Sequence, residues 1–403
     1  MSAEEKFLKY VTYDTQSDPE SSTAPSTEKQ LILADELKKE LENLGLVNVK
    51  RTPEGIVYAT LPATSAALPS VGFIAHMDTA GELSGRDVHP RIIEHWNGDT
   101  IQLNDEYSMN PADFPELKKV IGDSIIVTDG TTLLGNDDKA GIAIIMQTLE
   151  DLKNSQEPHG TVMAAFTPDE EVGRGVENFD LKEFPVDFAY TVDGGPVNCV
   201  DYETFNAAQA EIVIHGKSIH PGSAKNQMVN AAEIACRFAA AMPEFMTPEH
   251  TSGREGFIHL ISVEGETEKA RLIFIIRDHD KDLFAGKKEL IEKTVEAFEV
   301  LYPGRIDLTI RDQYENMRNY ADADLKTVKR AYRAVEKEGL KPESVAVRGG
   351  TDGAVLSARG LFTPNLGTGG GNCHGRYEFA SIDKMNKMVD ILKDIVLEGG
   401  NEA

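Results

Sequence analysis

The 403-residue sequence contains only three cysteines, one tryptophan and no long uninterrupted run of apolar residues. A membrane-spanning helix needs roughly 18 or more such residues, so we expect none. The cysteines, Cys199, Cys236 and Cys373, are odd in number and widely spaced, which argues against a disulfide framework and indicates thiols in a reducing compartment. We expect Cys199 and Cys236 to be buried structural thiols, and Trp96 to serve in packing.

Basic residues are also scarce. The chain has 41 Lys and Arg against 67 Asp and Glu, a net charge of −26. So acidic a surface repels phosphate backbones and anionic lipids, which argues against nucleic acid or membrane partners. Glu4 and Glu5 stand where a signal peptide would be basic, and no apolar segment follows them. We therefore expect a cytoplasmic protein that is neither secreted nor anchored.

The first half of the chain alternates strands with helices. Residues 28–44 and 140–152 carry apolar residues at helical spacing, with Ser26 and Thr27 as capping candidates before the first helix. The predicted strands are residues 55–61, 70–75, 124–127, 161–166 and 188–192. This alternation predicts an α/β domain with a central, mostly parallel sheet flanked by helices.

The pattern changes after about residue 205, where the sequence predicts a compact α+β insert. Its predicted strands are residues 210–215, 257–263, 270–277 and 305–310, and its predicted helices are residues 229–242 and 281–302. A helix over 325–338 then restarts α/β character. Because 403 residues are too many for one ordinary core, we predict a discontinuous domain, 1–205 with 320–403, interrupted by a smaller domain, 206–319.

Acidic residues and histidines gather at the ends of predicted strands, where α/β folds build their active sites. They are His76 and Asp78 in AHMDT, Asp137 and Asp138 in LLGNDDKAG, Glu170 and Glu171 in FTPDEEVG, Asp193 in TVDGG, and His374 in GGGNCHGRYEF. Imidazole and carboxylate together suit zinc or a neighbouring divalent metal. Clustered carboxylates repel one another without cations, so these residues predict a metal pair of the kind used in hydrolysis.

The motifs HMDT, GNDDKAG, TPDEEVG, VDGG and NCHGRYEF, in this order, closely resemble the peptidase T family of tripeptide aminopeptidases. That family is a branch of the dizinc hydrolases that also include aminoacylase and glutamate carboxypeptidases. The segments FLKYVTYDTQS, KSIHPGSAKNQMVNA, EGFIHL, IIRDHD and RGGTDGA extend the resemblance to nearly the whole chain. It implies a zinc-dependent enzyme that removes the first residue from tripeptides.

The resemblance also implies a ligand set for two zinc ions per subunit. Asp137 would bridge the two ions. Glu171 and His374 would complete one site, and His76 and Asp193 would complete the other.

Further roles follow from the same resemblance. Glu170 would be the general base that deprotonates the attacking water, and Asp78 would hydrogen-bond the second imidazole nitrogen of His76. The insert would be a lid and dimerisation domain of a homodimer that takes short peptides with a free N-terminus. The candidate substrate-binding residues are His220, Arg277, Arg348, Asn206 and Asn372.

Two other readings stay open at this point. The same metal site would serve a dipeptidase or a deacylase of N-acyl amino acids, because the metal ligands alone do not determine the length of the substrate. A metal-dependent peptide-binding protein without catalysis is the third reading, and Glu170 argues against it because a binder has no need for a base. His220 could also be an ordinary histidine, and Arg277 and Arg348 could form structural ion pairs.

Overall fold

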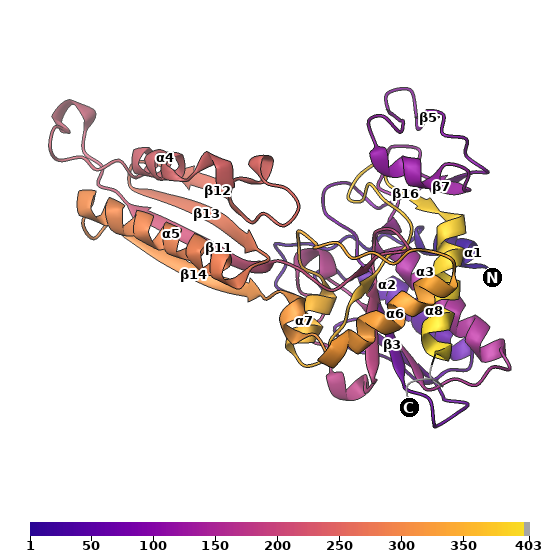
Figure 1. Ribbon diagram of the computed structural model, residues 1–403. Helices are drawn as coiled ribbons and strands as arrows, with labels where there is room; N and C mark the ends of the chain where they lie inside the picture. Colours follow the sequence, from indigo (N-terminus) through magenta and orange to yellow (C-terminus); the bar gives the residue numbers. More distant parts are fainter. Residues whose placement is uncertain (399–403) are drawn as a thin grey trace. The chain divides into compact units, whose positions relative to one another are not determined.

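The computed structural model describes residues 1–398, which fall into two compact units (Figure 1). The larger unit comprises Met1–Tyr202, Tyr320–Val345 and the chain from Thr351 onward. The smaller unit comprises Glu203–Asn319 and also Ala346–Gly350, a segment that the sequence analysis placed in the larger domain. Among the described residues, no helix combines the length and the apolar character that crossing a membrane requires.

A seven-stranded sheet forms the centre of the larger unit. Its order is β1 (Val47–Arg51), β2 (Val57–Leu61), β8 (Val162–Thr167), β3 (Val71–His76), β9 (Phe188–Val192), β15 (Asn365–Leu366) and β10 (Val200–Asp201). The four strands β8, β3, β9 and β15 run parallel, whereas β1, β2 and β10 pair antiparallel at the edges. The sheet is therefore mixed, with a parallel centre, and every residue of β2, β3 and β8 is buried.

Both faces of this sheet are covered, as near-continuous apolar strands require. On β3, Phe73 belongs to one apolar cluster and Ile74 to another, because successive side chains point to opposite faces. The helices on the Phe73 face are α1 (Ala3–Tyr10), α2 (Gln30–Asn43), α3 (Asn136–Asn154), α6 (Lys326–Lys337) and α8 (Ile382–Leu397). The Ile74 face is covered by α7 (Asp352–Ala358) and by residues 176–186.

Two small sheets complete the larger unit. One joins β16 (Phe379–Ser381), β7 (Ile125–Val127) and β4 (Arg91–Ile93), and the other pairs β5 (Ile101–Gln102) with β6 (Ser108–Met109). The strand predicted at 124–127 therefore exists but lies outside the central sheet. Trp96, only 4% exposed, packs in the apolar cluster beneath these strands, which confirms its packing role.

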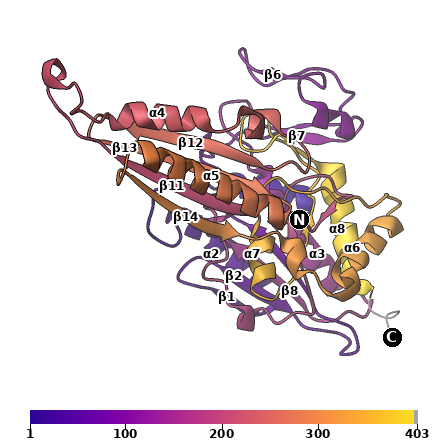
Figure 2. The ribbon, with the colours of Figure 1, turned by 60° about the vertical axis from the view of Figure 1, so that its left-hand side comes forward.

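The smaller unit is a four-stranded antiparallel sheet with two helices. The strand order is β12 (Phe257–Gly265), β13 (Lys269–Asp278), β11 (Asn206–His215) and β14 (Ile306–Tyr314). Helices α4 (Ala231–Ala241) and α5 (Lys281–Leu301) lie side by side over this sheet (Figure 2). This is the α+β architecture that the alternating strands predicted.

Two local expectations were wrong. Cys236 is exposed, because the buried face of α4 is formed by Ala231, Ile234, Ala235 and Phe238, and position 236 falls on the opposite side of the helix. Helix α2 begins after Lys29 without a side-chain cap, so neither Ser26 nor Thr27 caps it.

Candidate metal centre and active site

Three neighbouring parallel strands bring the candidate residues to one edge of the central sheet. His76 is the last residue of β3, and Thr167, its partner in β8, lies three residues before Glu170. Asp193 directly follows β9. Because β3, β8 and β9 are parallel, their carboxyl ends meet at the same edge, where ligand sites of open α/β sheets form.

Five of the predicted side chains meet in two groups that share Asp137. His76 Nε2 lies 2.9 Å from Asp137 Oδ1 and 3.7 Å from Asp193 Oδ1. His374 Nε2 lies 3.4 Å from Asp137 Oδ2 and 3.1 Å from Glu171 Oε2. Within each group the candidate ligand atoms lie within 4.8 Å of one another. Each group could therefore hold a metal ion, with Asp137 contributing one oxygen to each.

The charges of the two groups fit bound cations. Burial, followed by the neighbouring Asp137 carboxylate, raises the pKa of Asp193. Oε1 of Glu171 is buried without a hydrogen-bond partner. Hydrogen bonds to Asp137 and Glu171 raise the pKa of His374 to about 11, so a protonated imidazole offsets part of the negative charge of this cluster. Divalent ions would supply that positive charge instead and would leave both histidines as neutral ligands.

Asp137 is positioned by a residue that the sequence analysis missed. The buried Glu378 carboxylate accepts the backbone N–H groups of Leu134 at 2.8 Å, Gly135 at 2.7 Å and Asp137 at 3.0 Å. Burial raises the pKa of Glu378 to about 7 despite these three donors. The position of Glu378 four residues after His374 was the only available signal, and spacing alone does not identify such a bond.

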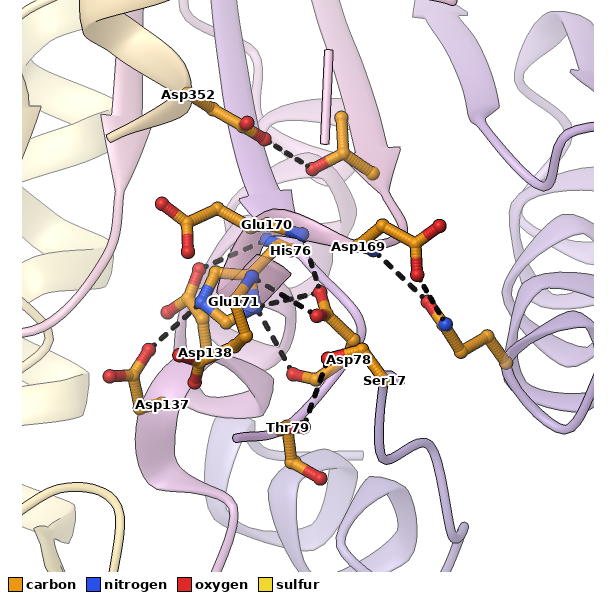
Figure 3. Close-up of polar contacts among 12 residues, drawn as sticks. Ser17, His76, Asp78, Thr79, Asp137, Asp138, Asp169, Glu170, Glu171 and Asp352 are labelled. Atoms are coloured by element: carbon orange, nitrogen blue, oxygen red, sulfur yellow. Dashed lines mark hydrogen bonds and ion pairs between the residues drawn. The ribbon is translucent and has the colours of Figure 1, made fainter. Parts of the chain in front are cut away.

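Asp78 makes contacts beyond those expected of it (Figure 3). It is fully buried, and its two oxygens accept the backbone N–H groups of Glu170 at 3.0 Å and of Glu171 at 3.1 Å. Nδ1 of His76 lies 3.3 Å from Asp78 Oδ1 and 3.1 Å from the Asp78 backbone oxygen. Asp78 thus orients His76 partly through its main chain, and its carboxylate fixes the loop that carries the two glutamates.

Glu170 lies beside the ligand groups without belonging to either. It begins a single 3-10 turn, Glu170–Val172, after Asp169, whose backbone is left-handed. Burial, opposed by His76, raises the pKa of Glu170 well above its ordinary value. A second acid lies nearby: Asp352 accepts a hydrogen bond from Thr167 Oγ1 at 2.8 Å, and burial raises its pKa to about 7. A carboxylate near a metal pair but outside its ligand set can move protons.

A hollow of about 710 Å³ opens next to Glu171 and His374. Its other walls come from residues 16–19, Thr27, Lys29, residues 80–82 and Val172. The hollow lies within the larger unit and gives a small polar molecule access to one of the two ligand groups.

The four substrate-binding candidates of the smaller unit lie among its own residues. Nδ2 of Asn206 donates to two backbone oxygens and its Oδ1 accepts from Asn316 N–H. The Arg277 guanidinium donates to the backbone oxygens of Ala208 and Ile276. His220 is exposed, and its Nδ1 accepts from Gly222 N–H. No ligand contact follows from these bonds, and the substrate roles stay predictions.

Arg348 and Asn372 are similarly engaged. Arg348 donates to the backbone oxygens of Gly253 and Glu255 and to Thr251 Oγ1. Its guanidinium also stacks over two rings, those of Phe205 and Phe257. Asn372 belongs to the larger unit, has a left-handed backbone and donates to the Tyr377 backbone oxygen, which is a turn-forming contact.

Comparisons with known proteins agree with this architecture. Residues 127–398 match the model of peptidase family M20/M25/M40. A relative named Peptidase T from Caldanaerobacter subterraneus subsp. tengcongensis is 51% identical over 397 residues, which are 97% of either chain. Peptidase T of Bacillus subtilis is 46% identical over 396 residues, again 97% of either chain.

Solved structures show the same fold. A tripeptidase from Staphylococcus aureus has a TM-score of 0.78 at 21% identity, with 98% of this chain and 96% of that chain covered. An aminopeptidase PepT from Bacillus cereus has a TM-score of 0.77 at 24% identity, covering 98% and 97%. A Bacillus subtilis protein described as a dinuclear metal binding peptidase has a TM-score of 0.65 at 13% identity, covering 98% and 96%. The relatives named Peptidase T are about half identical to this chain over nearly its whole length. The chain therefore belongs to peptidase family M20/M25/M40 and, within it, to the peptidase T proteins.

Proposed function

We propose that the chain is a two-zinc aminopeptidase that hydrolyses the first peptide bond of tripeptides. The observation that carries this proposal is the pair of three-residue ligand groups sharing Asp137, with Glu170 beside them. His76 and Asp193 would complete one site, and Glu171 and His374 the other. The relatives named Peptidase T favour a tripeptide substrate over a dipeptide or an N-acyl amino acid.

Zinc bound at these groups would lower the pKa of a bound water and polarise the scissile carbonyl. Glu170 would take a proton from the attacking water as the water oxygen bonds to the carbonyl carbon. It would then deliver that proton to the amide nitrogen as the carbon–nitrogen bond breaks. A carboxylate beside the two ligand groups but outside both is placed to accept and return a proton. Asp78, through the Glu170 and Glu171 N–H groups, would keep the base and its neighbouring ligand at fixed positions.

A substrate panel tests the proposal directly. Unblocked di-, tri- and tetrapeptides are compared with an N-acetylated tripeptide, before and after treatment with chelator and re-addition of zinc. We expect cleavage of the unblocked tripeptide, loss of activity on chelation and recovery with zinc. Glu170→Ala should abolish turnover with nearly unchanged metal content. Equal cleavage of the N-acetylated tripeptide, or full activity of Glu170→Ala, would contradict the proposal.

We further propose that the enzyme is a cytoplasmic homodimer that associates through its smaller unit. The three cysteines are all free thiols, as a reducing compartment requires. The edge strand β12 exposes Ile261 and Val263, which offers apolar surface for a second copy. Light scattering on the purified protein tests the dimer, and a monomer mass across the micromolar range would exclude it.

A further inference from the structure

The loop that carries Glu170 and Glu171 is held at Asp169, the residue before Glu170, by buried polar side chains of the N-terminal segment. Asp169 is 2% exposed, and its carboxylate accepts hydrogen bonds from Ser26 N–H at 2.6 Å, from Gln30 Nε2 at 2.7 Å and from the Ser26 hydroxyl. Gln30 Oε1 accepts the Asp169 backbone N–H at 3.1 Å, so the Gln30 amide bonds both the side chain and the main chain of Asp169. We call these three residues the Ser26–Gln30–Asp169 clamp.

The backbone of Asp169 shows why the clamp is needed. Asp169 adopts φ +58° and ψ 24°, in the left-handed region that side chains other than glycine rarely occupy. The next residue is Glu170, so this turn sets the direction in which the glutamate leaves the end of β8. Aspartate adopts this conformation more readily than most residues but still at a cost, so contacts around it help to hold it in place. The charge-assisted bonds of the clamp are such contacts.

The clamp also joins the loop to a wall of the hollow. Ser26 and Gln30 flank Thr27 and Lys29, which line the hollow beside Glu171 and His374. Ser26 does not cap the following helix, and its hydroxyl and N–H both go to Asp169. Ser26 precedes a helix but, instead of capping it, binds Asp169, which lies 143 positions further along the chain.

We propose that Asp169, held by Ser26 and Gln30, is a positioning residue that sets the orientation of the Glu170 carboxylate toward the scissile bond. This inference rests on the proposed function, because it takes Glu170 as the general base. Asp169 itself is a member of neither of the two ligand groups. A misplacement of about 1 Å in a reacting group costs on the order of 10²-fold in rate, so loosening the turn should lower kcat while substrate binding is retained.

Asp169→Asn is the main test, since asparagine tolerates a left-handed backbone and keeps the shape of the side chain. With unblocked trialanine as substrate and saturating zinc, we expect kcat to fall on the order of 10²-fold and KM to stay within about twofold. Ser26→Ala removes the hydroxyl's bond to Asp169 and the two bonds that this hydroxyl accepts from Asp18 N–H and Gln30 Nε2. Because it leaves the Asp169 carboxylate in place, it is the milder change and should lower kcat roughly tenfold. Because both substitutions act through the same turn, adding Ser26→Ala to Asp169→Asn should cause little further loss of kcat.

Asp87→Asn is the matched control. Asp87 also has a left-handed backbone, φ +56°, but its side chain is 79% exposed, so the same substitution there should leave kcat unchanged. Zinc content and the thermal midpoint are measured for every variant.

A lower midpoint with unchanged kcat in both clamp variants would show that the clamp is only structural. Loss of zinc from Asp169→Asn would show that it acts on the ligand Glu171 instead. Either result overturns the proposal. A fully active Glu170→Gln would refute the assignment of the base, which separates failure of the proposed function from failure of the clamp.

Discussion

Asp78→Asn is the change that most directly tests how the metal centre is held together. The two Asp78 oxygens accept the N–H groups of Glu170 and Glu171, and Oδ1 also lies 3.3 Å from His76 Nδ1. Asparagine has one oxygen and one NH₂ group, so one backbone N–H must face another donor. The volume and shape of the side chain are almost unchanged, which restricts the perturbation to charge and hydrogen bonding.

The magnitude follows from the number of bonds lost. A buried hydrogen bond to a charged group contributes about 1.5–3 kcal/mol, and each 1.4 kcal/mol is about tenfold in an equilibrium constant. Substitutions of groups that orient metal ligands typically weaken metal binding by about 10–100-fold. At the proposed zinc centre we therefore expect the zinc Kd of Asp78→Asn to rise by about 10–100-fold. We also expect kcat at saturating zinc to fall at least about tenfold, because the Glu170 backbone is released.

Competition with a chromophoric chelator measures zinc affinity, and tripeptide hydrolysis at several zinc concentrations separates metal loss from loss of rate. Asp87→Asn, an exposed site, is the control for replacing an aspartate. If Asp78→Asn folds, binds zinc as tightly as the unaltered chain and keeps its kcat, then the loop is held by something other than Asp78, and our account of the centre is wrong.

Three further predictions concern stability and reactivity. A Cβ at Gly141 in α3 would lie 1.9 Å from the backbone oxygen of Val192, so Gly141→Ala should lower the free energy of unfolding by about 3 kcal/mol in a denaturant titration. Gly286→Ala in α5, where nothing lies within 4 Å, should raise it by about 0.5–1 kcal/mol; equal effects of the two would contradict the packing argument. Burial raises the pKa of Asp201 to about 6 from 3.8, so the folded state loses stability as pH rises through this interval. Asp201→Asn should match the unaltered chain at pH 4 and be more stable by about 1–3 kcal/mol at pH 8, whereas a constant difference in urea melts would refute the assignment. Cys236, which is exposed, should react with a thiol reagent in the folded protein, while Cys199, whose pKa burial raises to about 11, should react only after unfolding; the reverse order would contradict the burial of these thiols.

The fold was predictable from the sequence where apolar periodicity was strong. Long buried strands such as β3 and β8, and the largely buried helix α3, can be recognised in the sequence because burial constrains nearly every side chain along them. Two-residue strands such as β10 and β15 carry no period at all, since their pairing depends on what the sheet places beside them. The strand at 124–127 was recognised as a strand, but a local pattern does not reveal which sheet a strand joins.

Candidate ligands could be proposed from the sequence, whereas the bonds that support them could not. His76 and Asp193 stand at the ends of strands, and that position limits where their side chains can go. The three backbone N–H groups bound by Glu378 and the bond from Ser26 to Asp169 join residues more than 140 positions apart. One sequence shows the type of each residue but not its distant partner. For the same reason the sequence does not show that Arg348 donates to Gly253, Glu255 and Thr251. Its role at the peptide carboxylate stays a prediction.

Three buried carboxylates outside the ligand groups share one physical task. Asp78, Asp169 and Glu378 each accept backbone N–H groups at or beside the loops that carry the candidate ligands and the base. A backbone held in this way keeps its place whether or not the ligand side chains bind metal, so little reorganisation remains to oppose metal binding or catalysis. Such bonds also place more negative charge around an already acidic cluster, which makes cations the natural partners of Asp137 and its neighbours. These buried acids outside the ligand groups therefore fix the positions of the residues that would bind the metal ions.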